Sequence, residues 1–260
     1  MLVDLHVGFQ KTGTTSLQAM LEANRDRLKA TFVNYDDRRL RPLIRACRRF
    51  EKRRDEPSAK AITEATRQLV AGLTGDHVVI TSESLSGPTP TPSRVGSVYQ
   101  MTPEILFRIK QGAGDATFRF HLGTRSEGKW LSSLYRHVLR TRGIAMDEAT
   151  FRALPAFAAF RFETVCNEIR SRIGELNVWR MEDDLNEVLG PGTGFLCAIG
   201  VSKDDLQHWK KVSPRNQGLT PKAVAILTSP VAMALPILAR RILSRFVTML
   251  IPESRGGATG

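Results

Sequence analysis

The chain has 260 residues, of which 42% are hydrophobic and 25% are charged, a composition ordinary for a soluble globular protein with room for one large α/β domain. The net charge of +12 and the pI near 10.2 are not ordinary, and they favour polyanions and membrane surfaces as partners without choosing between them. The three cysteines include no C-x-x-C pair, which excludes the usual zinc-ligand spacing and a disulfide scaffold, so we expect free thiols in a reducing compartment.

The chain opens with a strand, a glycine-containing loop and a helix. Residues 2–7 form an apolar, β-prone run that predicts a buried strand, residues 8–15 form the loop, and a helical apolar pattern begins at Ser16. In this geometry the loop N–H groups and the helix N-terminus converge on one point and favour negative charge there. Because Lys11 and several threonines lie in the loop, we expect the anion to be a phosphate or a sulfate ester.

This loop differs from a Walker A sequence. Gly8 and Gly13 have the G-x-x-x-x-G spacing, but Thr14 and Thr15 follow where a P-loop has Lys-Ser/Thr, and Lys11 lies earlier. A P-loop nucleoside triphosphatase without its post-glycine lysine would lack a contact to the β- and γ-phosphates. The run Gln-Lys-Thr-Gly-Thr-Thr-Ser instead resembles the 5′-phosphosulfate loop of the sulfotransferases that use 3′-phosphoadenosine 5′-phosphosulfate (PAPS), usually Pro-Lys-x-Gly-Thr-Thr/Ser.

The resemblance implies that the loop and the first helical turn hold the 5′-phosphosulfate of the donor. Gln10 stands where the family has proline, a replacement that lowers the stiffness of the loop but removes no ligand. The residues expected to contact the donor in this segment are Gln10, Lys11, Thr12, Gly13, Thr14, Thr15 and Ser16.

A strongly basic segment follows a first helix over about 16–30 and a short strand over 31–35. Residues 38–54 carry nine Lys or Arg and one Glu, with apolar residues between them at helical spacing. Two interpretations stay open: a surface for an acidic acceptor, nucleic acid or anionic lipid, and a solvated amphipathic helix whose arginines pair with nearby acids. No RNA- or DNA-binding motif accompanies the run, so we expect no specific nucleic-acid partner.

A second buried strand is predicted over 77–84, after a helix over 59–73. Ligands of open α/β sheets bind at the carboxyl ends of the strands, and Glu83 therefore stands where a catalytic base is expected, on the same edge as the anion loop. The segment Thr-Ser-Glu-Ser resembles the strand end that carries the catalytic glutamate in sulfotransferases acting on sugars. The alternative is a glutamate that caps the following turn.

A further strand over 117–122 leads to a helix over about 127–142. Arg125 and Ser133 form the pattern R-x7-S-x-Y, which resembles the segment of the family that binds the 3′-phosphate. An arginine at a strand end and a serine in the next helix can bind one phosphate together. The alternatives are an arginine paired with a surface carboxylate and a packed serine, and Ser132 is the neighbouring candidate.

The last part of the chain is less informative. Residues 103–111 and the aromatic-rich segment 144–175 predict helices, and 176–185 predicts a last strand followed by acids that open a helix. The family often brings a basic loop over the 3′-phosphate, and the resemblance suggests this role for Lys210, Lys211 or Arg215.

Residues 223–239 are 17 uncharged residues followed by arginines. A membrane-spanning helix needs about 20 apolar residues, and this stretch is shorter and contains prolines. We therefore expect a C-terminal helical hairpin or a peripheral membrane contact through 223–250. Because the first strand begins almost at Met1, we expect no signal peptide and a cytoplasmic location, with membrane association left open.

Taken together, the resemblance implies a three-layer α/β fold with a central parallel sheet flanked by helices, similar to that of P-loop proteins. It implies one domain over 1–220, with the acceptor site covered by 86–102 and 144–170, and a C-terminal helical extension with a flexible tail over 221–260.

The implied reaction is transfer of a sulfuryl group from PAPS to a hydroxyl or amine acceptor, such as a sugar or glycolipid. The resemblance assigns catalysis to Lys11 and Glu83 and requires no metal. His121 and His137 are alternative bases that rank below Glu83, because a lone histidine on a helix or strand is more often packed or at the surface. Two other functions remain open: a nucleotide-dependent phosphotransferase or NTPase, and a non-enzymatic binder of polyanions or membrane surfaces. The acceptor and the oligomeric state are not predicted.

Overall fold

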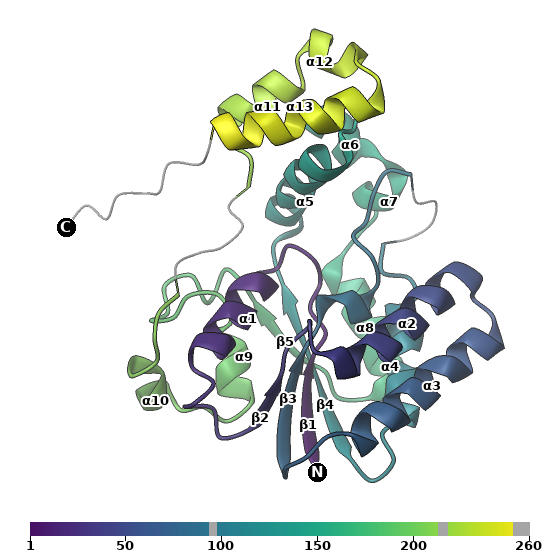
Figure 1. The fold of residues 1–260 in the computed structure, drawn as a ribbon, viewed down its shortest axis with the longest axis vertical. Helices are drawn as coiled ribbons and strands as arrows, with labels where there is room; N and C mark the ends of the chain where they lie inside the picture. The colour runs from purple at the N-terminus through teal and green to yellow at the C-terminus, as the bar shows by residue number, and fades with distance from the viewer. Residues whose placement is uncertain (94–97, 213–217, 252–260) are drawn as a thin grey trace. The chain divides into compact units, whose positions relative to one another are not determined.

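The computed structural model describes residues 1–93, 98–212 and 218–251. Five strands form one all-parallel sheet in the order β2-β3-β1-β4-β5 (Figure 1), which confirms the predicted α/β fold with a central parallel sheet flanked by helices. The strands are β1 (Leu2–His6), β2 (Thr31–Val33), β3 (His77–Thr81), β4 (Thr117–Thr124) and β5 (Asn177–Arg180).

Helices cover both faces of this sheet (Figure 1). On one face lie α1 (Thr14–Ala23), α9 (Thr193–Ala198) and α10 (Lys203–Gln207). On the other lie α2 (Arg41–Arg53), α3 (Glu56–Ala71), α4 (Thr102–Gln111) and α8 (Phe162–Ile173). Two short 3₁₀ helices complete this part, η1 (Arg38–Leu40) before α2 and η2 (Glu83–Ser86) after β3.

The chain divides into two compact units. The first, Met1–Thr89, Val98–Ser126 and Arg161–Ser213, contains the sheet. The second, Pro90–Ser97, Glu127–Phe160 and Pro214–Gly260, is helical in its described residues. Its helices are α5 (Glu127–Arg142), α6 (Glu148–Ala153), α7 (Pro155–Ala158), α11 (Pro221–Leu227), α12 (Pro230–Ala234) and α13 (Ile237–Leu250). The predicted domain over 1–220 takes segments from both units.

Some predicted boundaries are wrong. The first helix ends at Ala23 rather than near residue 30, because the Asn24 amide caps it by donating to the Met20 carbonyl at 2.9 Å. The acids after β5 do not open a helix. Instead the Asp184 carboxylate accepts backbone N–H groups from Gly192 and Gly194 at 2.8 and 2.9 Å. None of the helices in the described part of the chain combines the length and apolar character needed to cross a bilayer.

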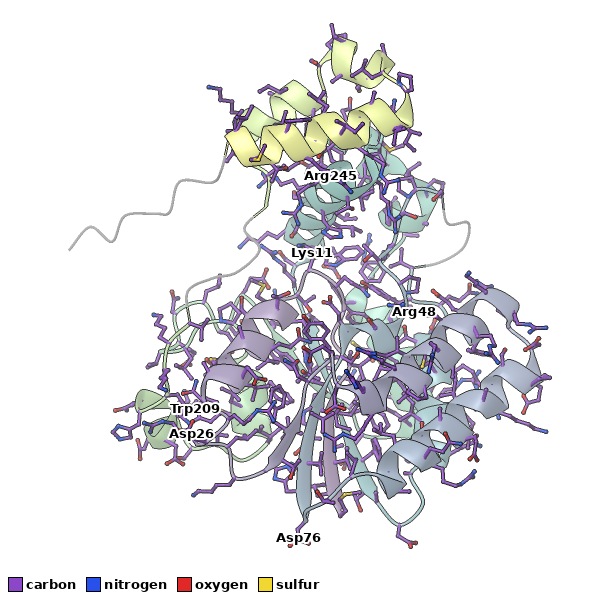
Figure 2. The ribbon with its side chains drawn as sticks, in the orientation of Figure 1. Lys11, Asp26, Arg48, Asp76, Trp209 and Arg245 are labelled. Carbon is purple, nitrogen blue, oxygen red and sulfur yellow. The ribbon has the colours of Figure 1, made fainter. Side chains whose placement is uncertain are left out.

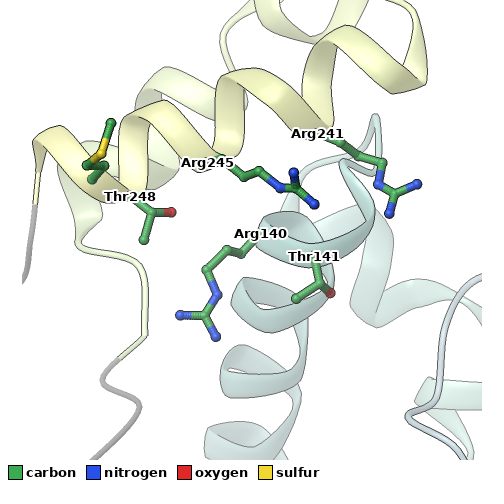
Figure 3. Close-up of a pocket in the computed structure, with 6 residues that line it drawn as sticks. Arg140, Thr141, Arg241, Arg245 and Thr248 are labelled. Atoms are coloured by element: carbon green, nitrogen blue, oxygen red, sulfur yellow. The ribbon is translucent and has the colours of Figure 1, made fainter.

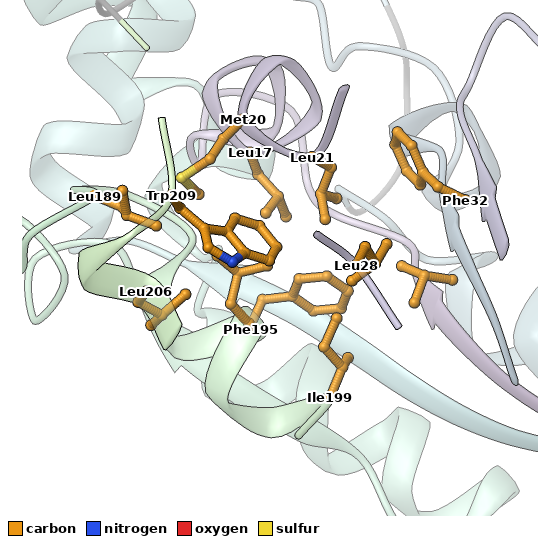
Figure 4. Close-up of a cluster of buried hydrophobic side chains, with 12 residues drawn as sticks. Leu17, Met20, Leu21, Leu28, Phe32, Leu189, Phe195, Ile199, Leu206 and Trp209 are labelled. Atoms are coloured by element: carbon orange, nitrogen blue, oxygen red, sulfur yellow. The ribbon is translucent and has the colours of Figure 1, made fainter. Parts of the chain in front are cut away.

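Helix α1 is fixed to the sheet by a buried apolar cluster (Figure 4). Leu17, Met20 and Leu21 are the apolar face of α1, and they pack with Phe195 of α9 and with Trp209 beyond α10. A buried leucine or phenylalanine side chain contributes roughly 1.5–3 kcal/mol, so this cluster holds the N-terminus of α1 firmly in place. That end of α1 carries the predicted anion loop.

The middle of the sheet contains a buried carboxylate. Asp4 of β1 has no exposed side-chain surface, and its oxygens lie 2.7 Å from His121 Nε2 and 2.6 Å from His77 Nε2. Arg119 of β4 donates to both oxygens, at 2.7 and 2.6 Å. Burial alone would raise the pKa of Asp4, but these hydrogen bonds outweigh it and hold that pKa well below its usual range.

Replacing this carboxylate should destabilise the protein. Asp4→Asn removes the charge that three partners share, and we expect a loss of about 3 kcal/mol in the free energy of unfolding at neutral pH. Because the folded-state pKa is depressed, the contribution of Asp4 is present above its unfolded pKa of about 4 and is lost as the pH falls through the folded pKa. Urea unfolding of both proteins should therefore show a difference that narrows on acidification; a constant difference would contradict this account.

Candidate functional site

The predicted anion loop lies at the carboxyl end of β1. Figure 2 shows Lys11 at one end of the first unit and Asp76, which precedes β3, at the other. Lys11 adopts a left-handed backbone conformation with φ of 70°, which is uncommon for a residue with a side chain. Such conformations cost free energy and concentrate at functional sites, so the backbone of Lys11 supports a role for this loop in binding.

Two glycines are needed for this loop to close over the start of α1. Gly8 has a φ of 58°, and a Cβ atom there would lie 2.8 Å from Thr14 Oγ1 and 2.9 Å from His6 Nε2. Gly13, the N-cap of α1, has a φ of 93°, and a Cβ there would lie 3.2 Å from Pro191 Cβ. Positive φ and close packing together restrict both positions to glycine.

Gln10 and Phe9 anchor the loop to the sheet domain. The Gln10 side chain accepts from the Tyr99 hydroxyl at 2.6 Å, and its backbone N–H donates to the same hydroxyl oxygen at 3.2 Å. The Phe9 ring is fully buried against Tyr99 and Phe162, with centroid separations of 4.4 and 5.4 Å. Proline, which the sulfotransferase motif has at the position of Gln10, lacks the N–H that this contact uses. Hydrogen bonding thus restrains a loop that has no proline to stiffen it.

The same loop is joined to the turn that carries Glu83. The Gln10 amide donates to the carbonyls of Glu83 and Gly87 at 3.2 and 2.7 Å, and the Ser86 hydroxyl donates to the Gly8 carbonyl at 2.8 Å. These bonds hold η2 against the loop. Burial raises the pKa of Glu83, and the positive charge of Lys11 partly opposes that rise. The carboxyl group is therefore a better proton acceptor than an exposed glutamate.

The hydroxyl groups of the loop and of the first turn of α1 have three different environments. Thr12 Oγ1 donates to the Phe9 carbonyl at 2.7 Å and thus supports the loop itself. Thr14 Oγ1 is buried and has no hydrogen-bond partner in the part of the chain that the structure describes. Thr15 and Ser16 are half-buried in the first turn of α1. A buried hydroxyl without a partner is costly, so the environment of Thr14 favours a bound polar group.

Arg125 follows β4 at the same edge of the sheet. Its Nε lies 3.9 Å from Glu182 Oε1, at the limit of an ion pair, and burial lowers the pKa of Arg125. Glu182 is held by the backbone N–H of Ser126 at 3.1 Å and by the Ser126 hydroxyl at 3.2 Å. Burial alone would raise the pKa of Glu182, but the bonds from Ser126 and the charge of Arg125 lower it. Glu182 thus stays charged beside Arg125 while binding mainly to Ser126.

Ser133 lies on α5, in the second unit, so its pairing with Arg125 stays a prediction. The neighbouring Ser132 is engaged: its hydroxyl donates to Glu148 Oε1 at 2.6 Å and accepts from Arg152. The Ser133 hydroxyl has no such bond among the described residues, which favours it over Ser132 as a ligand group. Of the predicted C-terminal basic loop, Lys210 bonds through its backbone to Asn24, and Arg215 lies outside the described residues.

The candidate histidine bases differ in accessibility. His121 is fully buried and its Nε2 contacts Asp4, so it belongs to the sheet interior rather than to an acceptor site. His137 lies on α5 in the second unit. A further histidine, His6, is buried under the loop against Trp179 and Phe195, and burial together with the charge of His121 lowers its pKa to about 3. His6 is therefore neutral and packs as an aromatic ring.

The sequence did not predict three features of the site: the contact of Tyr99 with the loop, the contact of Glu182 with Ser126, and the hydrogen bonds by which Gln10 restrains the loop. Tyr99 is 89 residues from Gln10 and no motif marks it. Glu182 lies in the segment for which the sequence predicted only a strand and the start of a helix. In residues 1–93, 98–212 and 218–251, no group of three or more His, Cys, Asp or Glu side chains is arranged to hold a metal ion.

The half-buried position of Glu83 predicts a gain in stability when its charge is removed. A raised pKa in the folded state means that folding disfavours the charged form of Glu83. The resulting loss of folding stability is present above the folded-state pKa and disappears as the pH falls below it. Glu83→Gln should thus raise the melting temperature at neutral pH, with a gain that shrinks on acidification. Glu175→Gln, an exposed control, should change little. Equal melting of Glu83→Gln and wild type at every pH would contradict the burial argument.

Comparison with known proteins gives no family for this chain: no protein-family model matches it, and a search of curated proteins finds no match.

Proposed function

We propose that the protein is a sulfotransferase that moves a sulfuryl group from PAPS to a hydroxyl or amine acceptor. The proposal rests on one observation: three hydrogen bonds connect the anion loop to the Glu83 turn. These bonds place a lysine-containing loop and a carboxyl group with a raised pKa at one edge of a parallel sheet. The likeness of the Gln-Lys-Thr-Gly-Thr-Thr-Ser run to the 5′-phosphosulfate loop supports the choice of donor.

The residues of the loop fit an anionic donor. The first N–H groups of α1 have no acceptor within the helix, and the helix dipole favours negative charge there. The buried Thr14 hydroxyl has no partner among the described residues, and a phosphate oxygen would provide one. Arg125, whose nearest carboxylate is 3.9 Å away, retains donors for a second phosphate, and Ser133 is the proposed co-ligand. Binding at both places would favour a nucleotide with a 3′-phosphate.

In the proposed reaction PAPS supplies an activated sulfuryl group, and the protein supplies positioning and charge. Lys11 stabilises the negative charge that grows on the oxygen bridging sulfur and phosphorus, and the helix N-terminus stabilises the 5′-phosphate. Glu83 accepts the proton of the acceptor, for which its raised pKa suits it better than an ordinary glutamate. Sugars and glycolipids are the acceptor class favoured by the likeness of the Glu83 segment to sugar sulfotransferases.

Nucleotide binding tests the donor site. Calorimetry with adenosine 3′,5′-bisphosphate, the product left by PAPS, should detect binding that Lys11→Ala and Arg125→Ala each weaken by about tenfold or more, because each removes charge-assisted hydrogen bonds worth roughly 1.5–3 kcal/mol. Arg48→Ala on α2, an exposed arginine, is the matched control and should bind normally. Equal weakening by Arg48→Ala would indicate general polyanion binding, and Mg²⁺-dependent ATP turnover would favour a phosphotransferase.

Kinetics tests the base. With radiolabelled PAPS and sugar or glycolipid acceptors, Glu83→Gln should lower kcat by about 10²–10⁴-fold, since that is the usual contribution of a general base. Wild-type kcat should fall on the acidic side as Glu83 becomes protonated, at a pH above that of an ordinary carboxyl group. Glu175→Gln serves as the control. A rate that survives Glu83→Gln with its acidic limb unchanged would remove Glu83 from the mechanism.

A further inference from the structure

A second basic site lies in the helical unit, away from the donor loop in the sequence. Helices α5 and α13 border a cavity of about 460 Å³ (Figure 3). Three arginine side chains line it, together with Thr141, Thr248 and Met249: Arg140 from α5, and Arg241 and Arg245 from α13. Helix α13 is held against α5 by Ser244, which is buried and donates to the Arg140 carbonyl at 3.0 Å.

Within the described part of the chain these three arginines have no acidic partner. Among the described residues, no ion pair or side-chain hydrogen bond joins Arg140, Arg241 or Arg245 to a carboxylate, and residues 221–250 contain no Asp or Glu at all. The adjacent Arg240 is different, because it donates to the carbonyls of Gly143, Met233 and Leu235 and so serves the fold. A cavity lined by uncompensated guanidinium groups favours an anion with several oxygens, such as a phosphate ester.

The same helix exposes an apolar face beside the arginines. Along α13, Leu238, Ile242 and Phe246 lie one above the other at successive turns, and the Phe246 side chain is 54% exposed. Leu250, one turn further, is 75% exposed. Ser244 and Val247 form the buried side of α13. Large apolar side chains grouped on one exposed helix face mark an interaction surface rather than an ordinary solvated helix.

We propose that α13 lies flat on an anionic membrane surface, with its apolar face in the interfacial region and Arg140, Arg241 and Arg245 on lipid phosphates. An amphipathic helix with arginines along the border of its apolar face has the arrangement that such helices use. Charge complementarity argues for lipid over a second copy of this chain, because a two-fold contact through α13 would bring two sets of uncompensated arginines together. The inference does not depend on the proposed sulfotransferase activity.

Vesicle binding tests the charged half of this surface. The full chain should sediment with phosphatidylcholine vesicles that contain phosphatidylserine, and far less with phosphatidylcholine alone. Arg241→Glu/Arg245→Glu should weaken binding by about tenfold or more, since each basic residue near such a surface contributes roughly 1 kcal/mol. Arg48→Glu/Arg49→Glu on α2 changes the net charge equally and should have a much smaller effect. Equal losses from the two pairs would overturn the proposal, because overall charge would then explain the binding.

Fluorescence tests the apolar half. Phe246→Trp should show a blue shift and quenching by brominated lipid when anionic vesicles are added, beyond the response of the wild-type tryptophans. Phe246→Ser/Leu250→Ser, checked for an unchanged circular dichroism spectrum and melting temperature, should lose most of its vesicle binding. An unshifted signal from the introduced indole in vesicle-bound protein would overturn the proposal. A second result would also overturn it: light scattering shows a wild-type dimer, the serine variant is monomeric, and neither protein binds vesicles. A second copy of the chain would then cover this face.

Discussion

Parallel pairing of β1 with both β3 and β4 is the constraint on which the candidate site depends. The register aligns His6 of β1 with Thr81 of β3, where both strands end, and with His121 of β4, which continues in the same direction to Thr124. The loop with Lys11, the turn with Glu83 and the position of Arg125 must therefore share one edge of the sheet. Segments more than a hundred residues apart in the sequence lie together there because the parallel pairing of the strands fixes where each strand ends.

The sequence was a good guide to what periodicity and strand ends control. Apolar β-prone runs predicted the strands, and the order of strand, loop and helix predicted the edge where Lys11 and Glu83 lie. Apolar periodicity was a poor guide where a polar side chain binds backbone groups at the end of a helix. Asn24 ends α1 early, and Asp184 binds the N–H groups of Gly192 and Gly194 where a helix was expected. The spacing of apolar residues carries no record of these polar contacts, so the predicted boundaries missed them.

Gln10 stands where the motif that this loop resembles has proline. Unlike proline, glutamine has a backbone N–H and leaves more conformational entropy to the unfolded loop. The Tyr99 hydroxyl accepts a hydrogen bond from that N–H and donates one to the Gln10 side-chain oxygen. The Gln10 amide nitrogen in turn donates to the Glu83 carbonyl. A proline ring would restrain the loop locally. Here hydrogen bonds to distant parts of the chain restrain it, and they also connect the loop to the Glu83 turn.

The buried carboxylate of Asp4 has a consequence for how the sheet finds its alignment. Strand β1 has apolar residues on both faces, as strands of covered parallel sheets do, so hydrophobicity alone would tolerate a slip by one residue. Such a slip would turn Asp4 to the opposite face, away from Arg119, His77 and His121. An unpaired buried charge is heavily disfavoured. One buried carboxylate in the central strand thus favours the observed register over a register shifted by one residue.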